Sequence, residues 1–303
     1  MTTTFDQIEL HKKLATYQGD DRVEPAAIIL EEARKKPTKE PYRSGLGRLD
    51  NTLKGGFFPG QLIVISGTTG MGKTTLAQTF TVNFLEKGIN PLWFSYEVAH
   101  EDFLEPFERY DKLSLKVIYM PLSMEKHHLA WIEERIIESY LKYNTRVVFI
   151  DHLHRLVEMN GKQSLTEQIG NTVVRLKQMA LKHGMVIFLL CHIGQEATKS
   201  DKELGLGSVR DSSFIEQEAD TVLYTWRHED GETNVLKIAK NRKGGKINVR
   251  LPLHYKEGRY FEQARDEYFH EAADRRAKGR GRSGVGKDAK DSVSERLCHT
   301  RHG

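Results

Sequence analysis

Short apolar runs alternate with amphipathic segments through most of the chain. The apolar runs that predict buried strands cover residues 61–66, 91–96, 146–151 and 185–191, with a weaker run at 116–121. The segments that repeat apolar residues at helical spacing cover residues 73–88, 125–143 and 164–184. Continuous apolar strands between amphipathic helices are typical of a mainly parallel sheet covered by helices on both faces. The pattern therefore predicts an α/β fold.

The pattern changes after residue 219 and again near each end of the chain. Runs at 220–227, 233–241 and 247–255 are separated by turn signals and predict strands that extend the sheet in antiparallel fashion. Residues 24–36 have helix-forming composition, and Pro37 is expected to end that helix. We expect an N-terminal extension at 1–44 with a short helix that could link subunits, a main α/β domain at 45–262 and a disordered basic tail at 263–303.

Composition narrows the class of protein. The 303 residues are 38% hydrophobic and 29% charged, which suits a protein with a substantial core. No apolar run is long enough to cross a membrane, and the first residues lack an apolar signal-peptide core. Cys191 and Cys298 are the two cysteines, so a disulfide framework is not expected. We expect no membrane partner and an intracellular protein: in the cytoplasm or nucleoid, or in a mitochondrial matrix or an infected cell if the source is eukaryotic or viral.

The formal charge of +4 is unevenly distributed. The segment from Arg275 to Lys287, both included, contains six basic residues and no acidic ones. Because the rest of the chain is nearly neutral, any affinity of the main domain for nucleic acid has to come from local patches.

A glycine-rich turn between a predicted strand and a predicted helix carries the clearest chemistry. Residues 67–74 fit the phosphate-binding motif G-x-x-x-x-G-K-[ST]. The residues predicted to bind the nucleotide are these eight and the one that follows them: Gly67, Thr68, Thr69, Gly70, Met71, Gly72, Lys73, Thr74 and Thr75. Glycines let backbone N–H groups surround phosphate oxygens at a helix N-terminus. Lys73 is expected to reach the outer phosphates and Thr74 to bind Mg²⁺. The predicted cofactors are ATP, or another nucleoside triphosphate, and Mg²⁺.

Three other strand ends carry polar side chains. Asp151 ends an apolar strand and is expected to hold Mg²⁺ with Thr74, while Glu97 follows another strand and could activate the attacking water. On local grounds a surface glutamate that begins a helix explains Glu97 nearly as well. His192 follows the apolar strand "FLLC", where position alone favours an ordinary polar residue.

A series of segments follows one another in the chain: "SGLGRLDNTLKGGFFPGQLIVISGTTGMGKTTLA", "WFSYE", "FIDHL", "LCHIGQE", "SVRDSSFIEQEADTVLYTWR" and "IAKNRKGG". In content and order they resemble the RecA-like motor domain of DnaB-type replicative helicases, closest in pattern to the phage primase-helicase and Twinkle branch. The resemblance implies a RecA-like P-loop NTPase core and a DNA helicase that hydrolyses ATP. It also implies a homo-oligomeric, usually hexameric, ring around single-stranded DNA, with a primase, loader or polymerase as further partners.

The resemblance also assigns roles to single residues. Lys73, Glu97 and Asp151 fall on catalytic positions, Arg242 on the arginine finger with Lys240 as its companion, and His192 on a sensor of the γ-phosphate. Two polar loops correspond to the DNA-binding loops of the family. Their candidate DNA contacts are Arg155, Lys162, Lys199, Lys202, Arg210 and Asp211. Without the resemblance, an exposed basic hairpin would explain "KNRK" and solvated loops would explain the other charges.

Two other hypotheses about the function stay open. One is a RecA- or RadA-like recombinase, a DNA-dependent ATPase that forms open filaments, although "FIEQEAD" argues against it. The other is an ATP-gated DNA-binding adaptor that hydrolyses slowly and does not move along DNA.

Overall fold

The sheet of this protein has the order β2-β3-β4-β1-β5-β6-β7-β8 in the described part of the chain. The structure is a computed structural model, and it describes residues 4–19, 21–35, 39–109, 115–157, 164–192, 212–228 and 233–263. The strands are β1 (Leu62–Gly67), β2 (Pro91–Ser95), β3 (Val147–Asp151), β4 (Val186–His192), β5 (Thr221–Arg227), β6 (Asn234–Asn241), β7 (Val249–Lys256) and β8 (Arg259–Glu262). Neighbouring strands from β2 to β5 are parallel, and those from β5 to β8 are antiparallel. The predicted fold class is confirmed.

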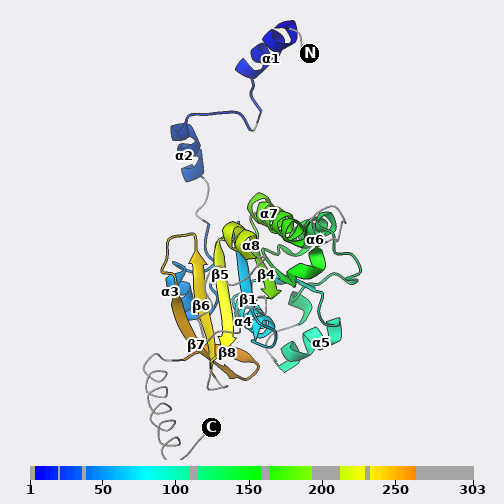
Figure 1. Cartoon of the computed structure of the whole chain (residues 1–303), viewed down its shortest axis with the longest axis vertical. Coiled ribbons are helices and arrows are strands. Elements are labelled where there is room, and N and C mark those ends of the chain that lie inside the picture. The colour runs from blue at the N-terminus through cyan, green and yellow to red at the C-terminus, as the bar shows by residue number, and fades with distance from the viewer. Residues whose placement is uncertain are drawn as a thin grey trace, which may run out of the picture. The chain divides into compact units, whose positions relative to one another are not determined.

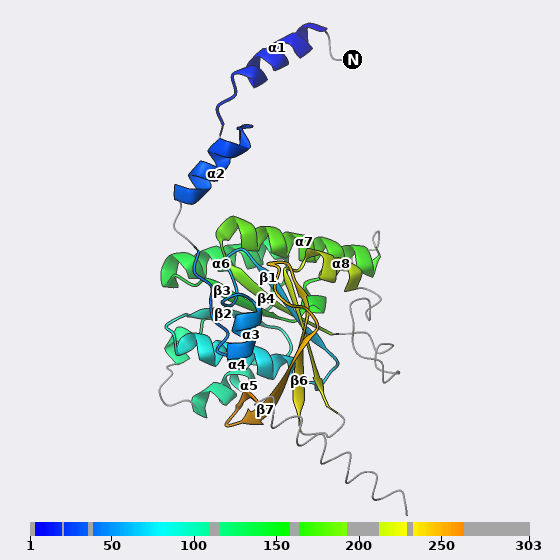
Figure 2. The same ribbon diagram turned by 90° about the vertical axis from the view of Figure 1, so that its left-hand side faces the viewer.

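Helices cover both faces of this sheet. They are α3 (Gly47–Thr52), α4 (Lys73–Leu85), α5 (His100–Leu104), α6 (Leu129–Tyr143), α7 (Leu165–His183) and α8 (Ser212–Glu218), with 3₁₀ turns at Glu105–Arg109, Leu115–Val117 and Leu153–Leu156. Buried side chains of α3, α4 and α5 form one core with alternate strand positions, and those of α6, α7 and α8 form a second core with the intervening positions. Figure 2 shows α6, α7 and α8 together along one side of the sheet. The alternation follows from the two-residue period of a strand.

Local sequence signals explain where several elements begin and end. Ser164 and Glu167 form a capping box at the start of α7, and Gly184 ends that helix in the left-handed region at φ 62°. Trp93, Phe149 and Phe188 occupy register positions on adjacent strands and stack with centroid distances of 4.5 Å. This aromatic ladder fixes the register of the strands whose ends carry the site.

One expectation from the sequence was wrong, and several elements were missed, among them the short helices α3, α5 and α8. The run at 116–121 is not a strand: its first residues form a 3₁₀ turn, and Tyr119 alone makes an isolated bridge with Leu92. The first residues, which lack a clear pattern, include helix α1 (Thr4–Ala15). Figure 1 also labels strand β8, which the sequence pattern did not predict.

The contacts divide the chain after Glu40 into two units. The first unit contains α1 and α2 (Ala26–Lys35), and no residue of α2 is buried. Ile28, Ile29 and Leu30 on α2 are 44%, 57% and 52% exposed. The expected basic tail at 263–303 lies outside the described residues except for Gln263. Among the helices described, none has both the length and the apolarity that crossing a bilayer requires.

Candidate functional site

The glycine-rich turn joins β1 to α4 at the carboxyl edge of the parallel strands. Gly70 and Gly72 have φ of 78° and 80°, a region that favours glycine, and α4 begins at Lys73 directly after them. A Cβ on Gly67 would lie 2.4 Å from the backbone oxygen of Thr225 on the adjacent strand. The turn therefore needs glycine both for its conformation and for its close approach to β5.

Lys73 lies at the centre of this turn. Its side chain is largely buried, and Nζ donates to the Thr68 carbonyl at 3.1 Å and lies 3.1 Å from Nδ1 of His192. Burial lowers the pKa of Lys73, whereas the charges of Glu97 and Asp151 raise it. These two acceptors are neutral, whereas hydrogen bonds from the ammonium group to phosphate oxygens would be charge-assisted and stronger.

Thr74 and Asp151 form an oxygen pair beside the lysine. The Thr74 hydroxyl donates to Oδ2 of Asp151 at 2.9 Å, and Asp151 is 2% exposed. Burial raises the pKa of Asp151 to about 6; the charge of Glu97 adds to this, and the Thr74 hydrogen bond opposes it. A hydroxyl and a carboxylate are ligand types that Mg²⁺ prefers, so this donor set fits the predicted metal.

Substitution of Asp151 by Asn is expected to stabilise the protein in the absence of nucleotide and metal. The buried carboxylate has a pKa of about 6, above its value in an unfolded chain, so the folded state loses stability as the pH rises through that interval. Asp151→Asn should therefore raise the free energy of unfolding by roughly 1–3 kcal/mol at pH 8. The gain should shrink towards pH 4. Thermal and urea unfolding of both proteins at the two pH values measures it, and a loss of stability at pH 8 would contradict it.

Glu97 lies just beyond β2, and two histidines contact it. Its Oε1 is 3.1 Å from Nε2 of His192 and 2.8 Å from Nδ1 of His152. The carboxylate is one-third exposed, so water can reach it. His192 thus touches both Lys73 and Glu97, which makes it part of the site; its role as a γ-phosphate sensor stays a prediction.

His152 was missed by the sequence reasoning. It directly follows Asp151, and its side chain is 12% exposed. Burial lowers its pKa to about 4, and the charge of Glu97 opposes that shift. The signal available in the sequence was its position after a strand-terminal aspartate, where parallel strands bring polar groups together.

The cleft over the P-loop has a volume of about 510 Å³. Its walls include Glu97 and His192 from the parallel strands, but also residues of the antiparallel extension that the sequence pattern did not single out: Arg227, Asn234, Tyr255 and Tyr260. Tyr255 is 53% exposed and packs edge-on against Tyr260. No local motif marks these residues, because they reach the cleft through strand pairing alone.

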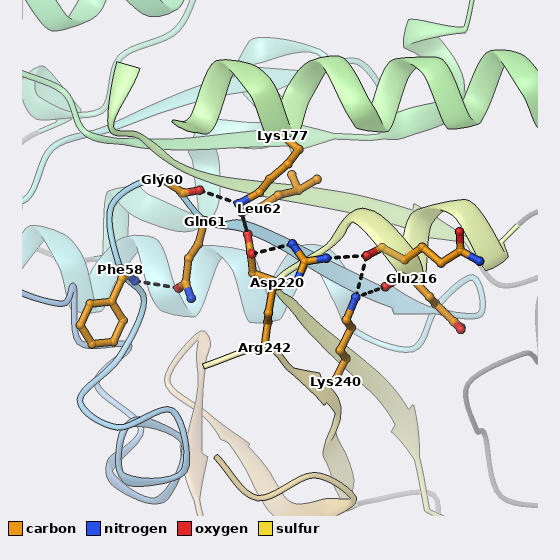
Figure 3. Close-up of polar contacts among 10 residues, drawn as sticks. Phe58, Gly60, Gln61, Leu62, Lys177, Glu216, Asp220, Lys240 and Arg242 are labelled. Atoms are coloured by element: carbon orange, nitrogen blue, oxygen red, sulfur yellow. Dashed lines mark hydrogen bonds and ion pairs between the residues drawn. The ribbon is translucent and has the colours of Figure 1, made fainter. Parts of the chain in front are cut away.

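Arg242 and Lys240 lie together at the end of β6, as Figure 3 shows. Arg242 donates to the Gln217 carbonyl at 2.7 Å and to Oδ1 of Asp220 at 3.3 Å. Lys240 donates to the carbonyls of Glu216 and Gln217. Both cations therefore satisfy carbonyl groups at the C-terminal end of α8, which is a favourable position for positive charge.

Asp220 holds this arrangement together at the amino ends of the parallel strands. Its Oδ2 accepts from the Leu62 backbone at 2.8 Å and from Nζ of Lys177 at 2.6 Å. Leu62 begins β1, whereas Gly67 ends it, so Arg242 and the P-loop lie at opposite edges of the sheet. Five residues of extended chain span roughly 16 Å. Arg242 in this position cannot reach the P-loop of the same chain.

The DNA-binding candidates are mostly outside the described residues. Arg155 is described: it is exposed and lies in the 3₁₀ turn Leu153–Leu156, just past the carboxyl end of β3. The candidates that lie outside are Lys162, Lys199, Lys202, Arg210 and Asp211. Their assignment stays a prediction.

Known proteins resemble the chain in sequence and in fold. The replicative DNA helicase DnaB of Mycoplasma genitalium is 27% identical over 251 residues, covering 69% of this chain and 53% of that protein. The DNA repair protein RadA of Rickettsia bellii is 26% identical over 206 residues, covering 66% of this chain and 42% of that protein. The solved structure of an ATPase domain superposes with a TM-score of 0.66 at 20% sequence identity, over 79% of this chain and 97% of that one.

A second solved structure, a DnaB-like replicative helicase described with its interactions with primase, also has a TM-score of 0.66 at 20% identity, over 86% of this chain and 72% of that one. The chain spans about half the length of the relatives it matches. The DnaB-like helicase C terminal domain matches residues 42–109 and 105–262, which include every described residue of the site. The chain therefore belongs to the DnaB-like helicase C-terminal domain family.

Proposed function

We propose that this chain is the ATP-hydrolysing motor of a DNA helicase, and that it works as a hexameric ring of identical subunits around single-stranded DNA. One observation carries the proposal. The phosphate-binding and water-activating groups lie at one edge of the sheet, while Arg242 lies at the other, beyond the reach of its own P-loop. A complete site then needs two subunits, and membership of the helicase family supports the same arrangement.

In this proposal the cleft binds Mg²⁺ and ATP. The backbone N–H groups of Gly67–Thr75 and the ammonium of Lys73 hold the phosphates, and Thr74 and Asp151 hold the metal, which supplies positive charge to the outer phosphates. Tyr255, exposed at the wall of the cleft, offers an aromatic face for the base. An aromatic face binds any base, so this contact does not by itself select ATP over another nucleoside triphosphate.

Glu97 orients the attacking water and accepts its proton. The carboxylate suits this role because it is partly exposed and lies beside the cleft that holds Lys73. His192 contacts both Lys73 and Glu97. Movement of Lys73 onto phosphate therefore changes the surroundings of His192 and, through it, those of Glu97. His192 also immediately precedes residues 193–211, which contain most of the proposed DNA contacts. Through it, nucleotide state and DNA binding are coupled.

The ring proposal extends to the N-terminal unit and to partners. The three apolar side chains on α2 are exposed within their own unit, so α2 is a candidate link between subunits. The DNA loops carry basic side chains and few aromatic ones, so contacts with the phosphate backbone should dominate. Primase, a loader or a polymerase are the proposed further partners.

A strand-displacement assay tests this function. Purified protein with Mg²⁺ and ATP should hydrolyse the nucleotide faster when single-stranded DNA is added, and it should separate a forked duplex. Lys73→Ala should lose both activities, whereas Lys87→Ala, an exposed lysine beyond the end of the same helix, should keep them. DNA-stimulated hydrolysis without strand separation under any loading condition would instead favour the recombinase or adaptor.

A further inference from the structure

The proposed hydrolysis does not require the close approach of three side chains, those of Glu97, His152 and His192. Each offers one ligand atom, and these three atoms lie within 4.8 Å of one another. Nδ1 of His152 approaches Glu97 Oε1 to 2.8 Å, yet it makes no hydrogen bond and is shielded from solvent. A buried ring nitrogen that faces a carboxylate without a hydrogen bond is an unsatisfied group. A shared cation would satisfy it.

The ligand set selects the kind of cation. A tetrahedral Zn²⁺ with bonds of about 2.0–2.2 Å holds its ligand atoms roughly 3.3–3.6 Å apart. Glu97 Oε1 is already 2.8 Å from His152 and 3.1 Å from His192, and the two histidine nitrogens lie within 4.8 Å of each other. Side-chain shifts on the order of 1 Å would bring the three atoms to the separations that the metal requires. Two imidazoles and one carboxylate suit Zn²⁺, Co²⁺ or Ni²⁺, whereas Mg²⁺ prefers oxygen ligands.

The second nitrogen of His192 explains how such a cation could coexist with phosphate binding. Lys73 contacts Nδ1, on the opposite side of the ring from Nε2, which faces Glu97. When Nε2 binds a metal, the ring keeps its one proton on Nδ1, and Lys73 loses an acceptor there. The ammonium is then released towards Thr68 or towards phosphate oxygens. Metal binding should therefore spare nucleotide binding.

We propose that Glu97, His152 and His192 form a transition-metal site of the zinc class, separate from the Mg²⁺ pair Thr74 and Asp151, and that its occupation inhibits hydrolysis. The site has three protein ligands and an open fourth position, because Glu97 and His192 are 33% and 28% exposed. A bound cation occupies the carboxylate oxygen that water activation needs. Metal binding is independent of the proposed function, but the inhibition rests on it.

Cobalt spectroscopy tests the site without relying on catalysis. Full-length protein should carry Cys298→Ser, His299→Asn and His302→Asn, which remove the candidate ligands near the C-terminus. Co²⁺ titrated into this protein without nucleotide should give the intense visible bands of tetrahedral coordination, and Zn²⁺ should abolish them. His152→Asn and Glu97→Gln should each weaken binding at least roughly tenfold. His254→Asn, an exposed histidine on β7, is the matched control and should bind normally.

The rate of Mg²⁺-dependent hydrolysis measures whether occupation of the site inhibits the protein. Zn²⁺ should lower turnover of the same protein while a fluorescent nucleotide binds with unchanged affinity, and excess Mg²⁺ should not restore the rate. His152→Asn should require at least about tenfold more Zn²⁺ for the same fractional inhibition. Tetrahedral bands that persist in both ligand variants, or that never form in their parent, would overturn the site. Normal cobalt binding with no hydrolysis by any variant would instead count against the proposed function alone.

Discussion

Arg242→Ala is expected to abolish DNA-stimulated hydrolysis while nucleotide binding survives. An arginine finger from a neighbouring subunit accelerates hydrolysis by about 10³–10⁵-fold, because its guanidinium presents fixed donors to the charge that develops on the phosphate. In this chain Arg242 contacts Asp220 and Gln217 at the edge of the sheet opposite the P-loop, so its loss should leave the P-loop intact. ATPase rates with and without single-stranded DNA, beside the affinity for a fluorescent nucleotide, measure the effect.

A mixing experiment separates action between subunits from a defect within one subunit. The Lys73→Ala variant keeps the proposed arginine finger but lacks the lysine that is proposed to bind phosphate. The Arg242→Ala variant keeps that lysine but lacks the finger. After subunit exchange, mixtures should hydrolyse faster than either parent, because an intact P-loop can meet an intact finger across some interfaces. Lys243→Ala, the adjacent basic residue over the ring of Phe58, should be active alone. Activity that varies linearly with the mixing ratio would count against a finger in trans.

Glu97→Gln should bind nucleotide normally and hydrolyse it roughly 10²–10⁴-fold more slowly. The substitution keeps the shape of the side chain and one oxygen but removes its ability to accept a proton. Glu101, an exposed glutamate in the first turn of α5, provides the matched control, and Glu101→Gln should retain its rate. The measurement is single-turnover hydrolysis with Mg²⁺. Near-normal turnover in Glu97→Gln would mean that Glu97 is only a surface residue near a helix start.

The parallel half of the fold and its site could be predicted because their signals are local. The strands at 61–66, 91–96, 146–151 and 185–191 are continuous apolar runs, and parallel strands bring their carboxyl ends to one edge. This alone places Gly67, Glu97, Asp151 and His192 near one another. The contacts among Lys73, His192 and Glu97 agree with that expectation.

The parts that sequence reasoning missed depend on pairing between distant segments. Tyr255 and Tyr260 reach the cleft over the P-loop only because β7 and β8 pair with each other and extend the sheet past β5. The apolar run around Tyr119 does not form a strand, because Tyr119 alone pairs with β2. His152 carries no motif of its own, and its proximity to Glu97 appears only when β2 and β3 are in register.

Electron microscopy of the purified chain with a non-hydrolysable ATP analogue and single-stranded DNA shows whether identical subunits form a closed ring around DNA and complete nucleotide sites between them. Wild-type protein should form closed, predominantly six-membered rings with density for DNA in the central channel, and Arg242→Ala should still assemble because it binds nucleotide. Open helical filaments on the DNA would contradict the ring and favour the recombinase, and particles that remain monomeric under these conditions would contradict shared sites altogether.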